Sequence, residues 1–350
     1  MDAIPSSKLQ KLNSLDYLRV IAVCMILYDH LGAFSNPGWK LKTIVDFLFS
    51  RPYVIVQDFG VLGVALFLII SGFLSVYRSY PPQHRAAKTG KRILKIYLSF
   101  VIGSLFFLAV QIITWQFDYT YWSWFSPQEW FDGITMLGFF NNHGDVINGT
   151  TWFLIPLFFF YIIQTLYSIL SDKVGIKALW ILDLFLIGFF YCIGTVNEPL
   201  ASRLSVVFFP LAGLIAGEFY KRDKLSNPFH AFFLLLMNSI LAVVCFYKFG
   251  FETYENNPYF PSFAYALLLF LLFLMFEDSF PPNKYVQFLC KISLSIYVLH
   301  MTFGSFLLAE FYYAGLKFTV SFLLTIPIVL LLSWIHYELV ERRLLRFLTR

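Results

Sequence analysis

The sequence predicts an all-α, polytopic integral membrane protein with about ten transmembrane helices and both termini in the cytoplasm. Of its 350 residues, 59% are hydrophobic and only 13% are charged, so a soluble fold of this size could not cover itself with polar side chains. The hydrophobic residues occur in runs of roughly 18–22, the length of helix that crosses a ~30 Å hydrocarbon core. Runs such as 232–246 and 267–276 do not alternate as the strands of an outer-membrane barrel would.

Ten segments are long and apolar enough to be spans, and we expect residues 1–350 to form one transmembrane domain. The predicted spans are 15–34, 53–77, 93–114, 150–170, 177–194, 203–219, 229–247, 258–276, 285–309 and 318–340. If the N-terminus is cytoplasmic, the inner segments carry nineteen Lys and Arg residues and the outer segments carry six. The positive-inside rule predicts such an asymmetry. The net charge of +5 therefore reflects membrane sidedness and does not indicate nucleic-acid binding.

Two further features bear on function. The cysteines, Cys24, Cys192, Cys245 and Cys290, lie far apart without a CxxC pair, so we expect small buried side chains and no metal site. The outer connection 115–149 has no Lys or Arg and is rich in Trp and Tyr, which is typical of a segment in the membrane interface. The alternative is that these aromatic residues line a binding site for a substrate that accepts a transferred group. No small-residue cleavage site follows the first apolar run, so we expect the first helix to be retained.

Polar groups inside a bilayer are costly, so each one in the first span is a functional candidate. Asp16 and Arg19 lie near its inner end, and Asp29 and His30 lie further out. Asp16 and Arg19 are three residues apart and share a helix face, so a structural ion pair would also account for them. His30 follows Arg19 by eleven residues, which is about 17 Å along the helix axis and reaches the outer half of the membrane.

A neutral imidazole accepts a proton near pH 7, so His30 is suited to activating a hydroxyl group. A hydrogen-bonded packing role is an equal alternative. The adjacent Asp29 should point to a different helix face, which argues against a simple Asp–His relay. His300 in the ninth span is predicted at a depth similar to that of His30, so the two histidines could share one cavity. A buried core histidine is the alternative for His300.

The connection 78–95 carries six basic residues and no acid, and it ends in Lys91-Arg92-Ile-Leu-Lys95. Basic groups at cytoplasmic helix ends commonly meet anionic lipid headgroups. The alternative is a phosphate-bearing ligand such as coenzyme A, because Arg binds phosphate oxygens through bidentate hydrogen bonds.

Five sets of residues then form a recognisable series. Residues 15–23 read LDYLRVIAV and are followed by His30; residues 59–74 read FGVLGVALFLIISGFL; and residues 91–97 read KRILKIY. The fourth set is TWFL at 151–154, and the fifth joins LSIYVLH at 294–300 with the closing YELVER at 337–342. In order and spacing, these segments resemble the acyltransferase-3 family of membrane acyltransferases over nearly the whole chain.

The resemblance implies transfer of an acyl group, usually acetyl, from cytoplasmic acyl-CoA to a hydroxyl group of an extracytoplasmic carbohydrate or glycolipid. It implies that His30 is a general base or a transient acyl carrier, with His300 as a second catalytic residue. The other implied site residues are Arg19, Arg92 and Lys95 for the phosphates of the coenzyme, Trp152 and Tyr297 for the acceptor, and Asp16 and Glu338 in supporting roles.

Acetyl-CoA is then a donor substrate, and no permanently bound cofactor or metal is expected. The expected partners are membrane lipids, acyl-CoA and the acceptor. Because no fused esterase-like domain is expected, the protein would act either alone or with a separate polysaccharide-assembly protein. The expected location is the cytoplasmic (inner) membrane of a bacterium. Some family members carry an acid where this chain has Leu157 or Ala65, so the sequence assigns no subfamily or acceptor. An exporter of a lipid-linked sugar is the alternative function, with prolines marking helix kinks, although no inverted halves are visible.

Overall fold

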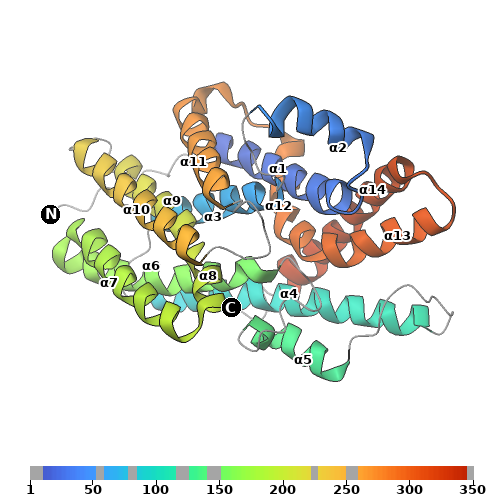
Figure 1. The fold of residues 1–350 in the computed structure, drawn as a ribbon, viewed down its shortest axis with the longest axis horizontal. Helices are drawn as coiled ribbons and strands as arrows, with labels where there is room; N and C mark the ends of the chain where they lie inside the picture. The colour runs from blue at the N-terminus through green and yellow to red at the C-terminus, as the bar shows by residue number, and fades with distance from the viewer. Residues whose placement is uncertain are drawn as a thin grey trace.

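A computed structural model describes residues 11–52, 59–77, 85–115, 126–139, 151–221, 228–249 and 259–344. Within these ranges the chain forms helices and no strand, which confirms the all-α prediction (Figure 1). The longer helices are α1 (Asn13–Tyr28), α3 (Phe59–Tyr77), α4 (Arg85–Trp115), α6 (Leu154–Val174), α7 (Lys177–Val196), α9 (Phe208–Lys221), α10 (Pro228–Phe249), α11 (Tyr259–Met275), α12 (Lys284–Leu299) and α14 (Phe318–His336). The shorter helices are α2 (Lys40–Val45), α5 (Pro127–Thr135), α8 (Glu198–Ser205) and α13 (Ser305–Tyr313).

Eight helical stretches in the described part of the chain are long and apolar enough to cross a membrane. They are Phe59–Tyr77, Ala86–Val110, Leu154–Val174, Lys177–Val196, Leu200–Tyr220, Phe229–Phe249, Lys284–Tyr313 and Phe318–Arg343. Each coincides with a predicted span, so the polytopic membrane fold is confirmed. The other two predicted spans are also helical, but α11 has only 17 residues and the first helix carries three charged side chains. The total of ten and the sidedness of the termini stay predictions.

Helix α3 lies at the centre of the bundle, where it packs against α1, α9, α11 and α6. Its closest neighbour is α9, and glycines allow the two backbones to touch. A Cβ atom on Gly72 would lie 1.8 Å from the carbonyl oxygen of Pro210, and one on Gly213 would lie 1.9 Å from that of Ile69. Because lipid supplies no hydrophobic force between helices, such small residues are what permits close packing in a membrane.

The two ends of the sequence meet inside the bundle, because α1 packs against α12 (Figure 1). The carboxylate of Glu277 accepts hydrogen bonds from the backbone N–H groups of Asn13 and Ser14, at 2.6 and 3.1 Å. It thereby satisfies donors that the start of a helix leaves unpaired. This contact brings the start of α1 and the connection between α11 and α12 to the same end of the bundle, as the predicted topology requires.

Two short helices lie in segments predicted as connections. Helix α5 starts with a capping box in which Ser126 and Glu129 exchange backbone hydrogen bonds, a signal that its sequence contains. Helix α2 continues as a π-helical segment, Asp46–Ser50. Most of the aromatic residues of the connection 115–149 lie outside the described residues. The cysteines differ from expectation, because Cys24 and Cys192 are exposed on the surface of the chain and only Cys245 is buried.

The glycine contact yields a test of the fold. Gly213→Ala should force α3 and α9 apart and lower stability by at least the ~1–3 kcal/mol typical of overpacking. Gly188→Ala is a matched control, because nothing lies within 4 Å of a Cβ at Gly188. Thermal unfolding in detergent should show a lower midpoint for the Gly213 variant alone. Equal midpoints for the two variants would contradict this account of the central packing.

Candidate functional site

The two membrane histidines form a direct hydrogen bond. Nδ1 of His30 lies 2.8 Å from Nε2 of His300, and the two rings are nearly parallel, with 11° between their planes. His300 is fully buried and His30 is mostly buried. Both lie in π-helical segments: Asp29–Ala33 ends the first helix, and His300–Gly304 joins α12 to α13. Segments of this kind occur often at functional sites. The sequence analysis expected the two histidines at a similar depth and left open whether they share a cavity. In the structure the two rings are in direct contact.

The hydrogen-bond partners of the pair assign its protons. Nδ1 of His300 lies 2.8 Å from the carbonyl oxygen of Tyr297 and 3.2 Å from that of Ile296. A carbonyl oxygen only accepts, so this nitrogen carries the N–H group. In a neutral ring Nε2 of His300 is then an acceptor, and Nδ1 of His30 must donate to it. The remaining nitrogen, Nε2 of His30, is therefore left with a lone pair that can accept a proton.

Asp29 lies closer to this basic nitrogen than the sequence analysis expected. Its Oδ2 atom is 4.0 Å from Nε2 of His30, and the Asp29 side chain is buried. Asp29 is the first residue of the π-helical segment, so the regular α-helix on which the expected side-chain directions rested ends at this point. At 4.0 Å the carboxylate makes no hydrogen bond to the ring, but it can stabilise a positive charge there.

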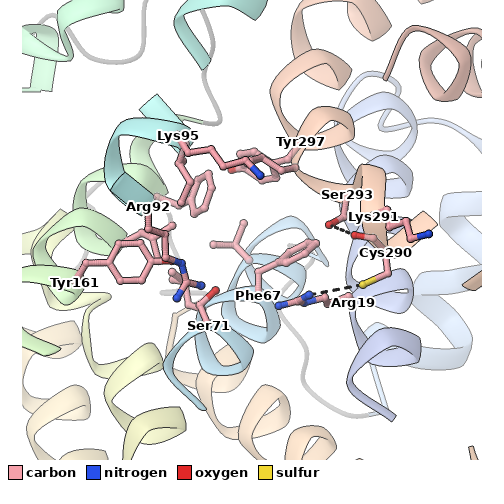
Figure 2. Close-up of a pocket in the computed structure, with 16 residues that line it drawn as sticks. Arg19, Phe67, Ser71, Arg92, Lys95, Tyr161, Cys290, Lys291, Ser293 and Tyr297 are labelled. Atoms are coloured by element: carbon pink, nitrogen blue, oxygen red, sulfur yellow. Dashed lines mark hydrogen bonds between the residues drawn. The ribbon is translucent and has the colours of Figure 1, made fainter. Parts of the chain in front are cut away.

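A pocket with a volume of about 340 Å³ lies between α1, α3, α4, α6 and α12 (Figure 2). Its described lining includes four basic residues and no acidic one: Arg19, Arg92, Lys95 and Lys291. The structure thus brings together the three residues that the resemblance implied for the phosphates of the coenzyme. It adds Lys291, which the sequence analysis did not single out. Leu157, which stands where some family members have an acid, forms part of the apolar wall.

The two arginines enter the pocket from opposite sides, with Ser71 and Phe67 between them (Figure 2). The guanidinium carbon of Arg92 lies 4.5 Å from the centre of the Tyr161 ring, a cation–π contact that orients the side chain. Arg19 donates to Sγ of Cys290 at 3.6 Å. Arg19 therefore belongs to the pocket, and Asp16 reaches its edge, because Asp16 accepts from Sγ of Cys290 at 3.2 Å and pairs with Lys11 at 2.6 Å.

Tyr297 joins the basic pocket to the histidine pair. Its side chain lines the pocket, and its carbonyl oxygen holds Nδ1 of His300. Its ring also lies 5.5 Å from that of His300 and 4.2 Å from that of Phe153, measured between centroids. Tyr297 thus contacts both the basic pocket and the histidine pair. Tyr297 and His300 together connect a ligand in the pocket to the basic nitrogen of His30.

The structure places other predicted residues outside this arrangement. Trp152 does not line the pocket; its ring packs edge to face on Tyr259, and the neighbouring Phe153 faces the pocket instead. Glu338 makes a two-pronged ion pair with Arg342 on the following turn, at 2.7 and 2.9 Å.

A buried polar network beside the pocket was missed by the sequence analysis. The hydroxyl of Ser295 lies 2.8 Å from Nδ1 of His336 and donates to Oε1 of Glu341 at 2.5 Å. All three residues are buried, and Glu341 lies within electrostatic range of Lys95. The signal was present in the sequence, because Glu341 lies in the closing segment YELVER at 337–342 that contributes to the family resemblance. The network connects the end of α14 to α12, and through Glu341 it lies close to Lys95 of the basic pocket.

Removing the shared hydroxyl tests this network. Ser295→Ala leaves a buried carboxylate and a buried imidazole without their common partner, which should cost ~1–3 kcal/mol. Ser305→Ala is the matched control, because its hydroxyl makes only a weak 3.9 Å contact with Sδ of Met301. Thermal unfolding in detergent should show a lower midpoint for Ser295→Ala than for Ser305→Ala. A Ser295→Ala protein as stable as the control would show that the network does not support the bundle.

Comparison with known proteins gives one family. No curated protein and no solved structure matches the chain. The Acyl_transf_3 family, described as an acyltransferase domain, matches residues 12–338, which includes both histidines and the whole basic pocket. This match covers nearly the whole chain, and the protein therefore belongs to the acyltransferase-3 family of membrane acyltransferases.

Proposed function

We propose that this acyltransferase moves an acyl group, acetyl in the simplest case, from cytoplasmic acyl-CoA to a hydroxyl group of an extracytoplasmic carbohydrate or glycolipid. The observation that carries the proposal is the position of Tyr297, which touches both the basic pocket and the histidine pair. A site for the phosphates of a donor and a site for proton transfer are thereby parts of one continuous structure.

The pocket has the chemistry that the coenzyme requires. Arg19, Arg92 and Lys95 offer donors to the diphosphate and to the 3′-phosphate, and no acid in the described lining opposes them. The distance to the histidines also fits. His30 lies about 17 Å along the helix from Arg19, and the pantetheine arm, with about fourteen bonds in its backbone, extends about 16 Å. Phosphates held at the inner end would thus place the thioester near His30.

The proposed reaction conserves protons. Nε2 of His30 takes the proton from the acceptor hydroxyl as its oxygen attacks the thioester carbonyl carbon. The carbon–sulfur bond then breaks, an ester forms, and the imidazolium returns the proton to the thiolate of coenzyme A. His300 fixes the tautomer of His30 by accepting from its Nδ1, and Asp29 stabilises the transient positive charge. In this scheme His30 is the catalytic base, while His300 is a positioning residue.

The scheme also assigns sides to the membrane. The basic pocket faces the cytoplasm, and the histidines receive the acceptor from the outer side, in keeping with the charge asymmetry of the connections. A bacterial cytoplasmic membrane that exports polysaccharide would supply such an acceptor, along with an assembly partner.

His30→Ala should abolish transfer. Loss of a general base typically costs ~10²–10⁴-fold in rate, and Nε2 of His300, which the substitution would free, belongs to a fully buried ring. The measurement is acetyl transfer by purified protein supplied with radiolabelled acetyl-CoA and a saccharide or glycolipid extract. Monodisperse elution and an unchanged unfolding midpoint would show that the variant is folded. Full activity in a folded His30→Ala protein would exclude the base assignment.

The positioning role of His300 predicts a graded series. His300→Gln keeps an acceptor oxygen that can receive the Nδ1–H of His30, whereas His300→Ala provides none. We expect His300→Gln to retain most of the rate, and His300→Ala to lose about tenfold or more in kcat with little change in KM. Equal losses in both variants would instead indicate that His300 acts through packing.

Cys290 provides a probe of donor binding that does not need turnover. It lines the pocket beside Arg19, so coenzyme A should slow its alkylation by N-ethylmaleimide in a protein whose other cysteines are replaced. Replacing Arg92 and Lys95 with Gln should weaken this protection by about tenfold or more, since each charge-assisted hydrogen bond contributes ~1.5–3 kcal/mol. Lys173→Gln, at the end of α6, is the control. Undiminished protection in the double variant would place the phosphates elsewhere.

A further inference from the structure

The two ends of the basic pocket differ in chemistry. In Figure 2, Tyr297 lies at the opposite side of the pocket from the guanidinium groups of Arg19 and Arg92. Along α12, Tyr297 follows Cys290, the contact of Arg19, by seven residues, which is about 10 Å along the helix axis. His300 follows three residues later. An acyl-CoA whose phosphates bind the arginines therefore has its acyl end directed toward Tyr297.

Phe153 and Tyr297 form the wall of the pocket at this end. Both side chains line the pocket, both residues are buried, and the two rings meet edge to face with their centroids 4.2 Å apart. The Tyr297 ring also lies 5.5 Å from the ring of His300. The wall therefore stands between the pocket and the histidine pair, and a thioester that travels from the pocket to His30 has to pass it.

Of the two rings, Phe153 is the one whose size can vary without moving the histidines. The carbonyl oxygen of Tyr297 holds Nδ1 of His300 at 2.8 Å, so Tyr297 also positions the pair. Phe153 lies in the 3-10 turn Thr151–Phe153, which directly precedes α6. Within the described residues it has no hydrogen bond or ring contact with either histidine. Its side chain therefore affects the passage and not the pair.

The segments that carry the two histidines are tightly packed. A Cβ atom on Gly32 would lie 2.5 Å from the Trp39 ring, and one on Gly304 would lie 2.9 Å from the Leu31 side chain. These glycines belong to the same π-helical segments as the histidines. One added methyl group would thus collide at either position, and extra methylenes in such packing force the neighbours to shift. In these two directions the pair offers no room for a long acyl chain.

We propose that Phe153 is a size filter that admits acetyl groups to the histidine pair and disfavours longer acyl chains. This inference rests on the proposed acyl transfer and specifies its donor. A larger acyl group has to hold the Phe153 ring away from Tyr297, which breaks their edge-to-face contact. One additional methylene in a close-fitting apolar site changes kcat/KM by ~10–200-fold, which is enough to separate acetyl from butyryl.

The test compares acetyl-CoA with butyryl-CoA as donors to the glycolipid extract used for His30→Ala. Because both donors are assayed with one protein preparation, the ratio of their kcat/KM values does not depend on the folded fraction. In the unaltered protein acetyl-CoA should be preferred by about a hundredfold, for two methylenes at about tenfold each. Phe153→Ala should reduce the ratio to within about tenfold, and Phe153→Leu should give an intermediate value.

Phe159→Ala is the matched control, because the Phe159 ring stacks on Phe189 and is not part of the described lining of the pocket. It should leave the donor ratio unchanged. Coenzyme A should protect Cys290 equally in all these variants, because the arginine end of the pocket is intact.

The inference is overturned if the unaltered protein uses butyryl-CoA as well as acetyl-CoA. It is also overturned if Phe153→Ala keeps the original ratio, if Phe159→Ala changes the ratio as much as Phe153→Ala does, or if Phe153→Ala loses the protection of Cys290. If neither thioester acts as a donor to the extract, the proposed function itself fails.

Discussion

The hydrogen bond between His30 and His300 joins helices from opposite ends of the sequence, 270 residues apart. In a region of low dielectric an imidazole without a partner is costly, so the pair constrains how the first span and the α12 span meet. That meeting in turn fixes Tyr297, whose carbonyl oxygen holds His300 and whose ring lines the basic pocket. The tautomer of the pair, the position of the pocket wall and the exposure of one basic nitrogen therefore follow from a single contact.

Several carboxylates of the bundle are paired with groups other than the arginines and lysines of the basic pocket. Lys11 pairs with Asp16, the start of α1 binds Glu277, and Arg342 pairs with Glu338. None of these carboxylates is part of the described lining of the pocket, although Asp16 accepts from Cys290 in that lining at 3.2 Å and Glu341 lies within electrostatic range of Lys95. Leu157 brings no negative charge to the pocket wall, at a position where some family members have an acid. The pocket therefore keeps a concentration of positive charge that suits a ligand with several phosphates.

Hydrophobic run length and charge asymmetry were sufficient to predict the fold class, and eight of the predicted spans are confirmed. The family resemblance implied the grouping of Arg19, Arg92 and Lys95, and the structure brings the three into one pocket. What the sequence did not predict depends on departures from regular geometry. A π-helical segment begins at Asp29, whose carboxylate lies 4.0 Å from Nε2 of His30, and no periodicity in the sequence signals that segment. Residues 40–50 read as an ordinary connection in the sequence, although Lys42 and Ser50 bind the buried carboxylate of Asp46 and the apolar side chains around them are exposed. An isolated stripe shows only which residues share a face and not which face is buried.

The chemistry of the pair explains why histidine suits this depth better than a carboxylate or an amine. A base that is charged at rest would have to be desolvated permanently, whereas two neutral imidazoles that satisfy one another carry no such cost. In the proposed cycle the positive charge exists only between removal of the hydroxyl proton and its return to the thiolate, and Asp29 stands 4.0 Å away during that interval. Because the proton is returned within the site, the reaction moves no net charge across the bilayer, and a buried neutral pair is sufficient to carry it.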